Sequence, residues 1–339
     1  MSGVHMTSAR RTSWVKMREM AVGEFDLIAK YFARPVRHAV LGGGDDCALL
    51  QPTPGMQWAV STDALVEGRH FLSTVPPDAL GHKALAVNLS DLAACGARPV
   101  AFTLALTLPR VDEPFLAGFA EGLYALAHAH GIELVGGDTT AGPLNLCITV
   151  MGEVPPGQAL RRNGAKPGDE LWVSGRLGDA RLALEAFRGQ VSLHGEAFDD
   201  VRRAMERPQP RVALGMALRG IASAAIDLSD GLVGDLGHVL RASAVGATLR
   251  LADIPHSAHV AACTEAQRRT CLLAGGDDYE LLFAAPAHAH ASVRDAGARA
   301  GTPVTCIGTL DAAPGLRVVD ASGAPVPLDE RAFDHFLSA

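Results

Sequence analysis

Apolar and polar positions along this chain follow two periods, and these periods predict helices and strands that alternate. The run DALGHKALAVNLSDLAACGA (78–97) has apolar residues at helical spacing, with Asp78 as the expected N-cap and Gly96 as the stop. The run PVAFTLALTLP (99–109) is short and almost wholly apolar, as in a buried strand. Such alternation favours the α/β class.

The same patterns predict the remaining elements and one boundary. Helices are expected at 23–32, at 113–131, from Gly178, near 197–220, in the last part of 222–243 and near 287–300. Strands are expected at 56–63, 132–140, 144–154, 170–175, at the start of 222–243, at 246–255, and near 304–310 and 316–320. The segment 155–170 is rich in Pro, Gly and Arg, so we expect it to begin a second domain, 155–339, after a first domain, 23–154.

Composition is that of a packed protein, with 339 residues, 48% apolar and 20% charged, a length that fits two domains. The net charge of −7 and the lack of a basic run exclude nucleic acid and anionic membrane as expected partners. No run of about 18 uncharged apolar residues predicts a membrane span. The six scattered cysteines contain no Cys-x-x-Cys, which favours reduced thiols and a cytoplasmic location.

Residues 1–22 carry several basic residues but no apolar core of a secretory signal. We expect them to be a disordered N-terminal extension or a tag, with a transit peptide as the alternative.

Two stretches far apart repeat one pattern of glycines, aspartates and leucines: LGGGDDCALL (41–50) and LAGGDDYELL (273–282). Other aspartates stand beside Ser, Thr or Gly, several of them just after apolar runs, where open α/β sheets build their sites. A single aspartate there is often a helix cap or an Asx-turn. The whole set, however, predicts an acidic pocket that needs a hard cation such as Mg²⁺, and no His/Cys cluster suggests zinc.

Glycine turns at 42–44 and 136–137 can present backbone N–H groups to anionic oxygens. The usual nucleotide motifs are nevertheless missing: there is no G-x-x-x-x-G-K-[ST], no G-x-G-x-x-G and no protein-kinase signature set. A nucleotide site in this chain would therefore belong to a less common class.

These motifs, in this order, resemble the thiamine-monophosphate kinase family, within the superfamily of aminoimidazole ribonucleotide synthetase, selenophosphate synthetase and the hydrogenase-maturation dehydratase. The matching stretches span about residue 23 to the C-terminus and include GEFDLIAKYF, GGDDCALL, STDALVEGRHF, KALAVNLSDLAACGARP, GGDTTAGP, NGAKPGDELWVSG, AIDLSDGLVGDLGHVL, GGDDYELLF and FDHF. The resemblance implies two α/β domains with mixed sheets. It also implies that the N-terminal domain binds ATP and magnesium and pairs in a homodimer, while the C-terminal domain contributes to the substrate site.

The resemblance also implies roles for individual residues. The magnesium ligands would be Asp46, Ser61, Thr62, Asp63, Asp91, Asp138, Asp227 and Asp230. The contacts to ATP would be Gly137, Asp138, Arg162 and Ser229. The contacts to the thiamine end of the substrate would be His70, Asp277 and Phe333.

Two of the substrate positions depart from the family pattern. Asp277 stands where the family commonly has Glu, and Phe333 stands where Tyr or Trp is frequent. The carboxylate of Asp277 is therefore one methylene shorter, and the ring of Phe333 lacks a polar handle. Lys83, eight residues before Asp91, is left open as either a carboxylate partner or a solvated charge.

The implied reaction is ATP plus thiamine monophosphate giving ADP plus thiamine diphosphate, by direct in-line transfer, as the last step of thiamine diphosphate biosynthesis. The attacking phosphate has a second pKa near 6 and is mostly dianionic at neutral pH, so no general base is expected. The chemistry instead needs alignment and charge cancellation between two anions.

Four alternatives remain at this point. Selenophosphate synthesis would need a reactive Cys in a glycine-rich N-terminal loop, which Cys47 lacks, and hydrogenase maturation would need a C-terminal Cys, whereas the chain ends DHFLSA. A binding protein without catalysis would form no thiamine diphosphate. A metal-dependent phosphatase would release phosphate from ATP without thiamine monophosphate.

Overall fold

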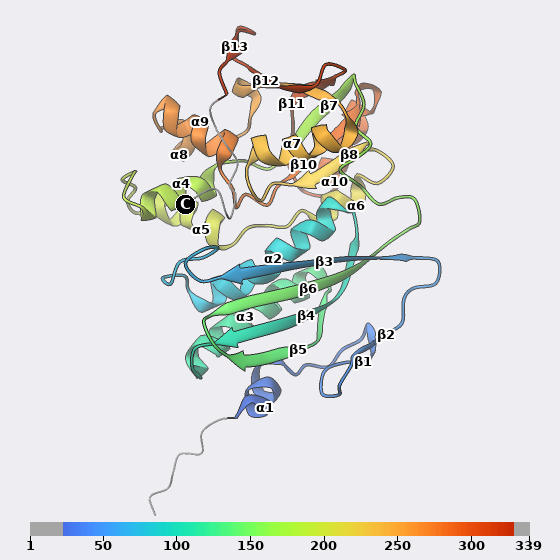
Figure 1. Ribbon diagram of the computed structural model, residues 1–339, viewed down its shortest axis with the longest axis vertical. Coiled ribbons are helices and arrows are strands. Elements are labelled where there is room, and N and C mark those ends of the chain that lie inside the picture. The colour runs from blue at the N-terminus through green and yellow to red at the C-terminus, as the bar shows by residue number, and fades with distance from the viewer. Residues whose placement is uncertain (1–22, 329–339) are drawn as a thin grey trace, which may run out of the picture.

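The computed structural model describes residues 23–328, which form two layered bodies stacked along the long axis of the molecule (Figure 1). The predictions for residues 1–22 and for Phe333 lie outside this range. The prediction of an α/β class with mixed sheets is confirmed, because a four-stranded and a seven-stranded sheet each combine parallel and antiparallel pairs with helices. Between residues 23 and 328, none of the helices has both the length and the apolar character required to cross a membrane.

The N-terminal body is built on a four-stranded sheet in the order β3-β6-β4-β5. Its elements are α1 (Glu24–Leu27), η1 (Ile28–Phe32), β1 (Ala39–Leu41), β2 (Leu49–Leu50), β3 (Gln57–Val66), α2 (Pro77–Ala94), β4 (Arg98–Leu108), α3 (Glu113–His130), β5 (Glu133–Ala141) and β6 (Asn145–Val154). The β4–β5 pair is parallel, and the pairs with β6 are antiparallel. Helices α2 and α3 cover one face of this sheet, and no helix formed by residues 23–328 lies on the opposite face (Figure 1).

Helix α2 lies between the two bodies and is buried on nearly every side, including Lys83, Asn88 and Ser90. It approaches α3 through two glycines. A Cβ atom on Gly81 would lie 2.0 Å from the carbonyl oxygen of Phe119, and one on Gly122 would lie 1.8 Å from that of Asp78. Because no larger residue fits at either position, these glycines set the distance between the helices and hence the position of the polar groups on α2.

The C-terminal body is built on a seven-stranded sheet in the order β13-β12-β9-β11-β7-β10-β8. Its strands are β7 (Asp169–Ser174), β8 (Ala224–Asp227), β9 (Gly246–Arg250), β10 (Leu281–Pro286), β11 (Val304–Asp311), β12 (Gly315–Val319) and β13 (Pro325–Val326). Its helical elements are α4 (Asp179–Phe187), α5 (Glu196–Glu206), α6 (Val212–Ala217), α7 (Leu232–Ser243), η2 (Leu251–Asp253), α8 (Ala258–Ala261), α9 (Glu265–Ala274), η3 (Ala287–Ala289) and α10 (His290–Arg299).

Several local predictions were wrong. Helix α2 begins at Pro77, with Pro76 rather than Asp78 as its N-cap, because proline is preorganised for the first helical turn. The strand expected to reach residue 255 ends at Arg250 and turns into a 3₁₀ helix. Helix α9 and strand β10 were not predicted at all. The helix expected at 23–32, by contrast, is present, as a short α-helix that continues as a π-helix.

Candidate active site between the two domains

Polar side chains from both bodies meet where β8 ends against α2. Ser90 Oγ donates to Asp227 Oδ2 at 2.7 Å, which joins α2 to the last residue of β8. Ser61 Oγ on β3 donates to Asp91 Oδ2 on α2. Because Ser90 and Asp91 are adjacent on one helix, these two contacts bring the carboxylates of Asp91 and Asp227 into one neighbourhood.

Asp63 joins this group from the edge strand β3. Its backbone N–H donates to Asn88 Oδ1 at 3.1 Å, and the Asn88 amide donates to the carbonyl oxygen of Ala84 at 3.0 Å. Asn88, which lies one helical turn before Asp91, therefore ties the strand to the helix. Ser61 and Asp63 face the helices because side chains alternate along a strand.

Burial and crowding raise the pKa values of these carboxyl groups. The pKa of Asp63 rises to about 6 through desolvation, then through the charges of Asp91 and Asp230. The pKa of Asp227 rises to about 7 through desolvation, then chiefly through the charge of Asp91. Desolvation likewise raises the pKa of Asp91, which the Ser61 hydrogen bond and Arg162 partly oppose. The site thus has more buried negative charge than its own side chains neutralise.

The turn after β8 is closed by Asp235, a residue to which the sequence analysis assigned no role. Its Oδ2 accepts hydrogen bonds from the backbone N–H groups of Asp230 and Gly231, both at 3.1 Å. Desolvation, followed by the charge of Asp230, raises the pKa of Asp235 to about 7. An aspartate in the first turn of α7, directly after a Ser-Asp-Gly turn, is the sequence signal that could have identified this role.

The second Gly-Gly-Asp-Asp loop reaches the same region from the C-terminal body. Lys83 Nζ donates to Asp277 Oδ2 at 3.0 Å, and the Tyr279 hydroxyl donates to Asp277 Oδ1 at 3.1 Å. Burial raises the pKa of Tyr279 well above its usual range, and the charges of Asp277, Asp63 and Asp227 add to this rise. Tyr279, itself part of this loop, therefore lies close to the acidic cluster, and Lys83 is a carboxylate partner rather than a solvated charge.

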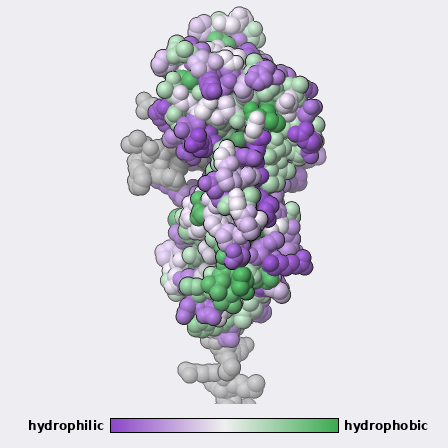
Figure 2. Space-filling model, turned by 90° about the vertical axis from the view of Figure 1, so that its right-hand side faces the viewer, coloured by the Kyte–Doolittle hydropathy of each residue, from purple (hydrophilic) through white to green (hydrophobic). Residues whose placement is uncertain are grey.

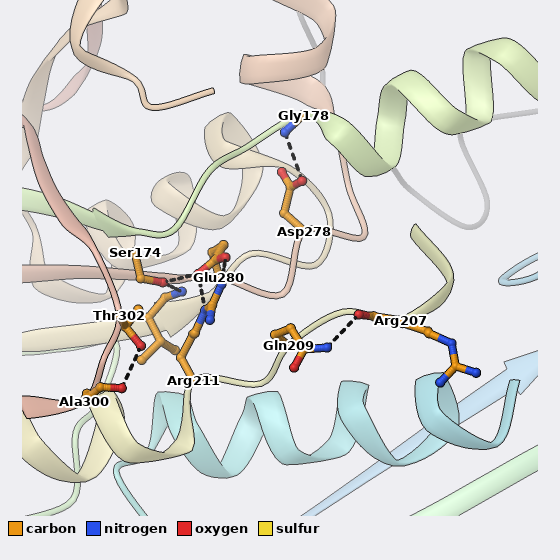
Figure 3. Close-up of polar contacts among 10 residues, drawn as sticks. Ser174, Gly178, Arg207, Gln209, Arg211, Asp278, Glu280, Ala300 and Thr302 are labelled. Atoms are coloured by element: carbon orange, nitrogen blue, oxygen red, sulfur yellow. Dashed lines mark hydrogen bonds and ion pairs between the residues drawn. The ribbon is translucent and has the colours of Figure 1, made fainter. Parts of the chain in front are cut away.

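Figure 3 shows how this loop is anchored through Asp278 and Glu280. Arg211 donates to both carboxylate oxygens of Glu280, with Nε at 2.7 Å from Oε2, and Ser174 Oγ donates to Glu280 Oε2. Asp278 Oδ1 accepts a hydrogen bond from the backbone N–H of Gly178 at the start of α4, at 3.0 Å. The residues on either side of Tyr279 are thereby fixed to β7, to the start of α4 and to the start of α6.

Three other predicted site residues lie away from the interdomain cluster in the structure. Thr62 points to the helix-free face of the sheet, where its hydroxyl is 2.8 Å from that of Thr149. Asp138 lies on the same face but at the opposite edge strand, β5. Asp46 is exposed in the loop between β1 and β2, and Gly43 of that loop lies beside the backbone of Gly136. One copy of the chain does not bring these three residues to the interdomain cluster.

The remaining predicted contacts have identifiable local roles. His70 Nδ1 accepts the backbone N–H of Val66 at 3.0 Å, in the turn after β3. The carbonyl oxygen of Ser229 accepts the backbone N–H of Asp277 at 2.9 Å. At Gly137, with φ of 154°, a Cβ atom would lie 1.9 Å from the carbonyl oxygen of Leu104, so only glycine fits there.

The donor set at the interdomain cluster consists of carboxylate and hydroxyl oxygens, which are the ligands that Mg²⁺ takes. Within residues 23–328, no three His, Cys, Asp or Glu side chains are grouped closely enough to hold a metal ion by themselves. Mg²⁺ usually keeps several waters and binds substrate phosphates through only one or two carboxylates, so the residues present fit such an ion together with a phosphate ligand.

The raised pKa values predict an unusual dependence of stability on pH. Asp63 and Asp227 have pKa values of about 6 and about 7 when folded and about 3.9 when unfolded. The folded protein therefore holds more protons between about pH 4 and pH 7, and these groups lower the free energy of unfolding as pH rises through that window. We expect the metal-free Asp227→Asn variant to gain thermal stability over the parent protein at pH 8 but not at pH 4. A parent protein whose advantage over the variant grows with pH would contradict this.

Comparisons with known proteins show which family this chain belongs to. The N-terminal domain model of AIR synthase related proteins matches residues 44–154, and the C-terminal domain model matches residues 166–321. The thiamine-monophosphate kinase of Salmonella typhimurium is 49% identical over 327 residues, covering 94% of this chain and 100% of that protein.

Solved structures show the same relation. The crystal structure of thiamine-monophosphate kinase from Stenotrophomonas maltophilia has a TM-score of 0.80 and 43% identity, covering 85% of this chain and 92% of that one. A structure described as AaThiL complexed with AMPPCP and TMP has a TM-score of 0.73 and 27% identity, covering 84% of this chain and 89% of that one. The chain belongs to the thiamine-monophosphate kinase family of AIR synthase related proteins.

Proposed function

We propose that this chain transfers the γ-phosphoryl group of ATP to thiamine monophosphate, giving ADP and thiamine diphosphate. The observation that carries the proposal is the pairing of Ser61 with Asp91 and of Ser90 with Asp227, which joins acidic groups of both domains in a chain of this family. A relative solved with AMPPCP and TMP, an ATP analogue and the phosphate substrate, supports the same pair of ligands.

The side chains of the cluster would hold the two anionic substrates through magnesium. We propose that the metal ligands at the interdomain cluster are Asp63, Asp91, Asp227 and Asp230, with the Ser61 hydroxyl as a further oxygen ligand. Magnesium ions would neutralise charge on the phosphates when they are bound. Arg162, whose charge partly opposes the rise in the pKa of Asp91, would bind phosphate oxygens directly, and neither substrate needs a general base. The transfer would then be in line.

The organic end of the substrate would lie toward Asp277 and His70. Asp277 presents a carboxylate whose side chain is 34% exposed, beside the buried ring of Tyr279. A carboxylate complements the cationic thiazolium ring and the amino group of the pyrimidine. Phe333, outside the described residues, remains assigned to this end by the family resemblance.

We further infer that two copies pair through the helix-free face of the four-stranded sheet. That face exposes Val60 at 62% and carries Thr62 and Asp138. A second apolar area lies on β1 and β2, seen as the green patch low on the molecule in Figure 2, where Val40 is 71% exposed. A sheet face of this kind is typical of an interface. Pairing would also allow the side chains of Asp138 and Asp46 to reach the acidic cluster of the partner copy.

Two measurements test the dimer. Val60→Asp should convert a dimer to a monomer in sedimentation, with little loss of monomer stability because the side chain is exposed. Mixing the inactive variants Asp138→Asn and Asp227→Asn should restore activity if each site uses both copies. A monomeric parent protein, or a mixture that stays inactive, would refute the shared site.

The reaction itself is tested by incubating the protein with ATP, magnesium and thiamine monophosphate and separating the products. We expect thiamine diphosphate and ADP in equal amounts, because one phosphoryl group is transferred per turnover. Omission of thiamine monophosphate distinguishes the rivals, since a phosphatase would still release phosphate. Magnesium-dependent hydrolysis of ATP without thiamine diphosphate would overturn the proposal.

A further inference from the structure

We propose that Lys83 is the positioning residue for Asp277, so that a lysine buried between the domains sets the affinity for the organic substrate without touching it. The inference rests on the proposed function, because it concerns how that substrate is recognised. Among residues 23–328, Lys83 carries the one buried ammonium group beside the acidic cluster, and the proposal gives this group a role.

The burial of Lys83 is the first observation. The residue is 2% exposed, in the middle of a helix that is covered on both sides. A buried ammonium group requires a counter-charge and hydrogen-bond acceptors. Its hydrogen-bond partner among the described residues is Asp277 Oδ2, at 3.0 Å, although a lysine can donate three hydrogen bonds. The position of Lys83 on α2 is therefore coupled to one oxygen of one carboxylate.

The other oxygen of Asp277 is held from a different direction. The Tyr279 hydroxyl donates to Oδ1 at 3.1 Å, so one donor on α2 and one within the loop itself fix the plane of the carboxylate. An ionised carboxylate offers about four acceptor positions, and this pair uses two of them. The rest remain for a ligand, since the Asp277 side chain is 34% exposed while that of Lys83 is 3% exposed. Asp277 can therefore contact a substrate, and Lys83 acts through it.

The backbone supports the same arrangement. Asp277 and Tyr279 have φ values of 66° and 50°, in a region that non-glycine residues seldom adopt. Their N–H groups donate to the carbonyl oxygens of Ser229 at 2.9 Å and Leu228 at 2.8 Å. Strained residues that the surrounding structure holds in place are common at ligand sites. The loop is thus fixed directly against the turn that carries Asp230.

The short side chain of Asp277 explains why a fixed carboxylate matters here. Asp277 carries its carboxylate on a single methylene, so the position of its oxygens depends on the loop and on the two donors that hold them. The thiamine end of the substrate offers a cationic ring and an amino donor, both of which a rigid ionised carboxylate favours. Removing the lysine should loosen the carboxylate and weaken this contact, while ATP is held elsewhere.

A double-mutant cycle tests the inference. In steady-state assays, Lys83→Met should raise KM for thiamine monophosphate about 10-fold or more, the size expected for a lost charged hydrogen bond, and leave KM for ATP within about 2-fold. Asp277→Asn should do the same, and adding Lys83→Met to Asp277→Asn should change KM by less than about 3-fold. Tyr279→Phe, which removes only the hydroxyl, should raise the same KM by a smaller factor.

The controls separate positioning from folding. Lys30→Met removes a lysine from the exposed pair with Glu113 and should leave both KM values unchanged. Lys83→Arg, which keeps the charge, should recover part of the affinity, and if Lys83→Met does not fold, Lys83→Arg and Tyr279→Phe decide the question. Equal rises in both KM values, or a full Lys83→Met effect in the Asp277→Asn background, would overturn the inference. A parent protein that forms no thiamine diphosphate would instead refute the proposed function.

Discussion

Replacing Asp227 by Asn should reduce kcat by about 10³-fold, because the variant keeps the shape of the side chain but loses a charge that the transfer depends on. Asp227 is 6% exposed, accepts the Ser90 hydroxyl and stands where β8 meets α2. An amide oxygen can still accept that hydrogen bond, so the local structure should persist. The loss would therefore come from weakened binding of the cation and the phosphates rather than from misfolding.

Thermal unfolding distinguishes a loss of catalysis in Asp227→Asn from misfolding of the variant. Because burial raises the pKa of Asp227 to about 7, removing its charge should not lower the Tm of the metal-free protein at pH 8. Asp295→Asn, on the exposed side of α10, changes the same atoms and should leave kcat and Tm unchanged. Full activity in Asp227→Asn, or inactivity accompanied by a large fall in Tm, would contradict the assigned role.

Gly122→Ala should destabilise the N-terminal domain by about 3 kcal/mol, the upper part of the range for overpacked cores. The new methyl group would lie 1.8 Å from the carbonyl oxygen of Asp78, and backbone cannot move aside as a flexible side chain can. The helices would have to separate, which displaces Lys83, Ser90 and Asp91 together. We expect a Tm about 6–12 °C lower and reduced activity.

Gly237→Ala is the matched control for this substitution. Its Cβ would meet only the flexible end of Arg241, at 3.2 Å, within helix α7. Alanine is the better helix former, so this variant should be as stable as the parent protein or up to about 1 kcal/mol more stable. Equal stability of the two alanine variants would show that the α2–α3 contact tolerates a methyl group.

The sequence patterns predict the N-terminal body closely, because its elements are long and its periods are clear. Strands β4 and β6 and helix α3 lie where alternation and capping place them. The elements after residue 255 are harder to predict from the sequence. Helix α9 is short and β10 directly follows a glycine loop, so neither element is long enough to show a clear hydrophobic period. Proline at the start of α2 was overlooked in favour of the next possible cap.

The candidate site is predictable as a set of residue types but not as an arrangement. Motif positions identify Asp63, Asp91 and Asp227, yet they do not reveal that Thr62 faces away from its neighbours on β3, because that depends on which face is buried. Lys83 contacts Asp277 although the two residues are 194 positions apart, and spacing along the sequence carries no information about such a pair.

A crystal structure of this protein with Mn²⁺, a non-hydrolysable ATP analogue and thiamine monophosphate would test the interdomain metal site directly. Mn²⁺ replaces Mg²⁺ at oxygen sites and can be located by its anomalous scattering. We expect Mn²⁺ within about 2.5 Å of carboxylate oxygens of Asp63, Asp91, Asp227 or Asp230, with the γ-phosphate on the same ions. Metal and phosphates bound at another place, with those four carboxylates unliganded, would contradict this expectation.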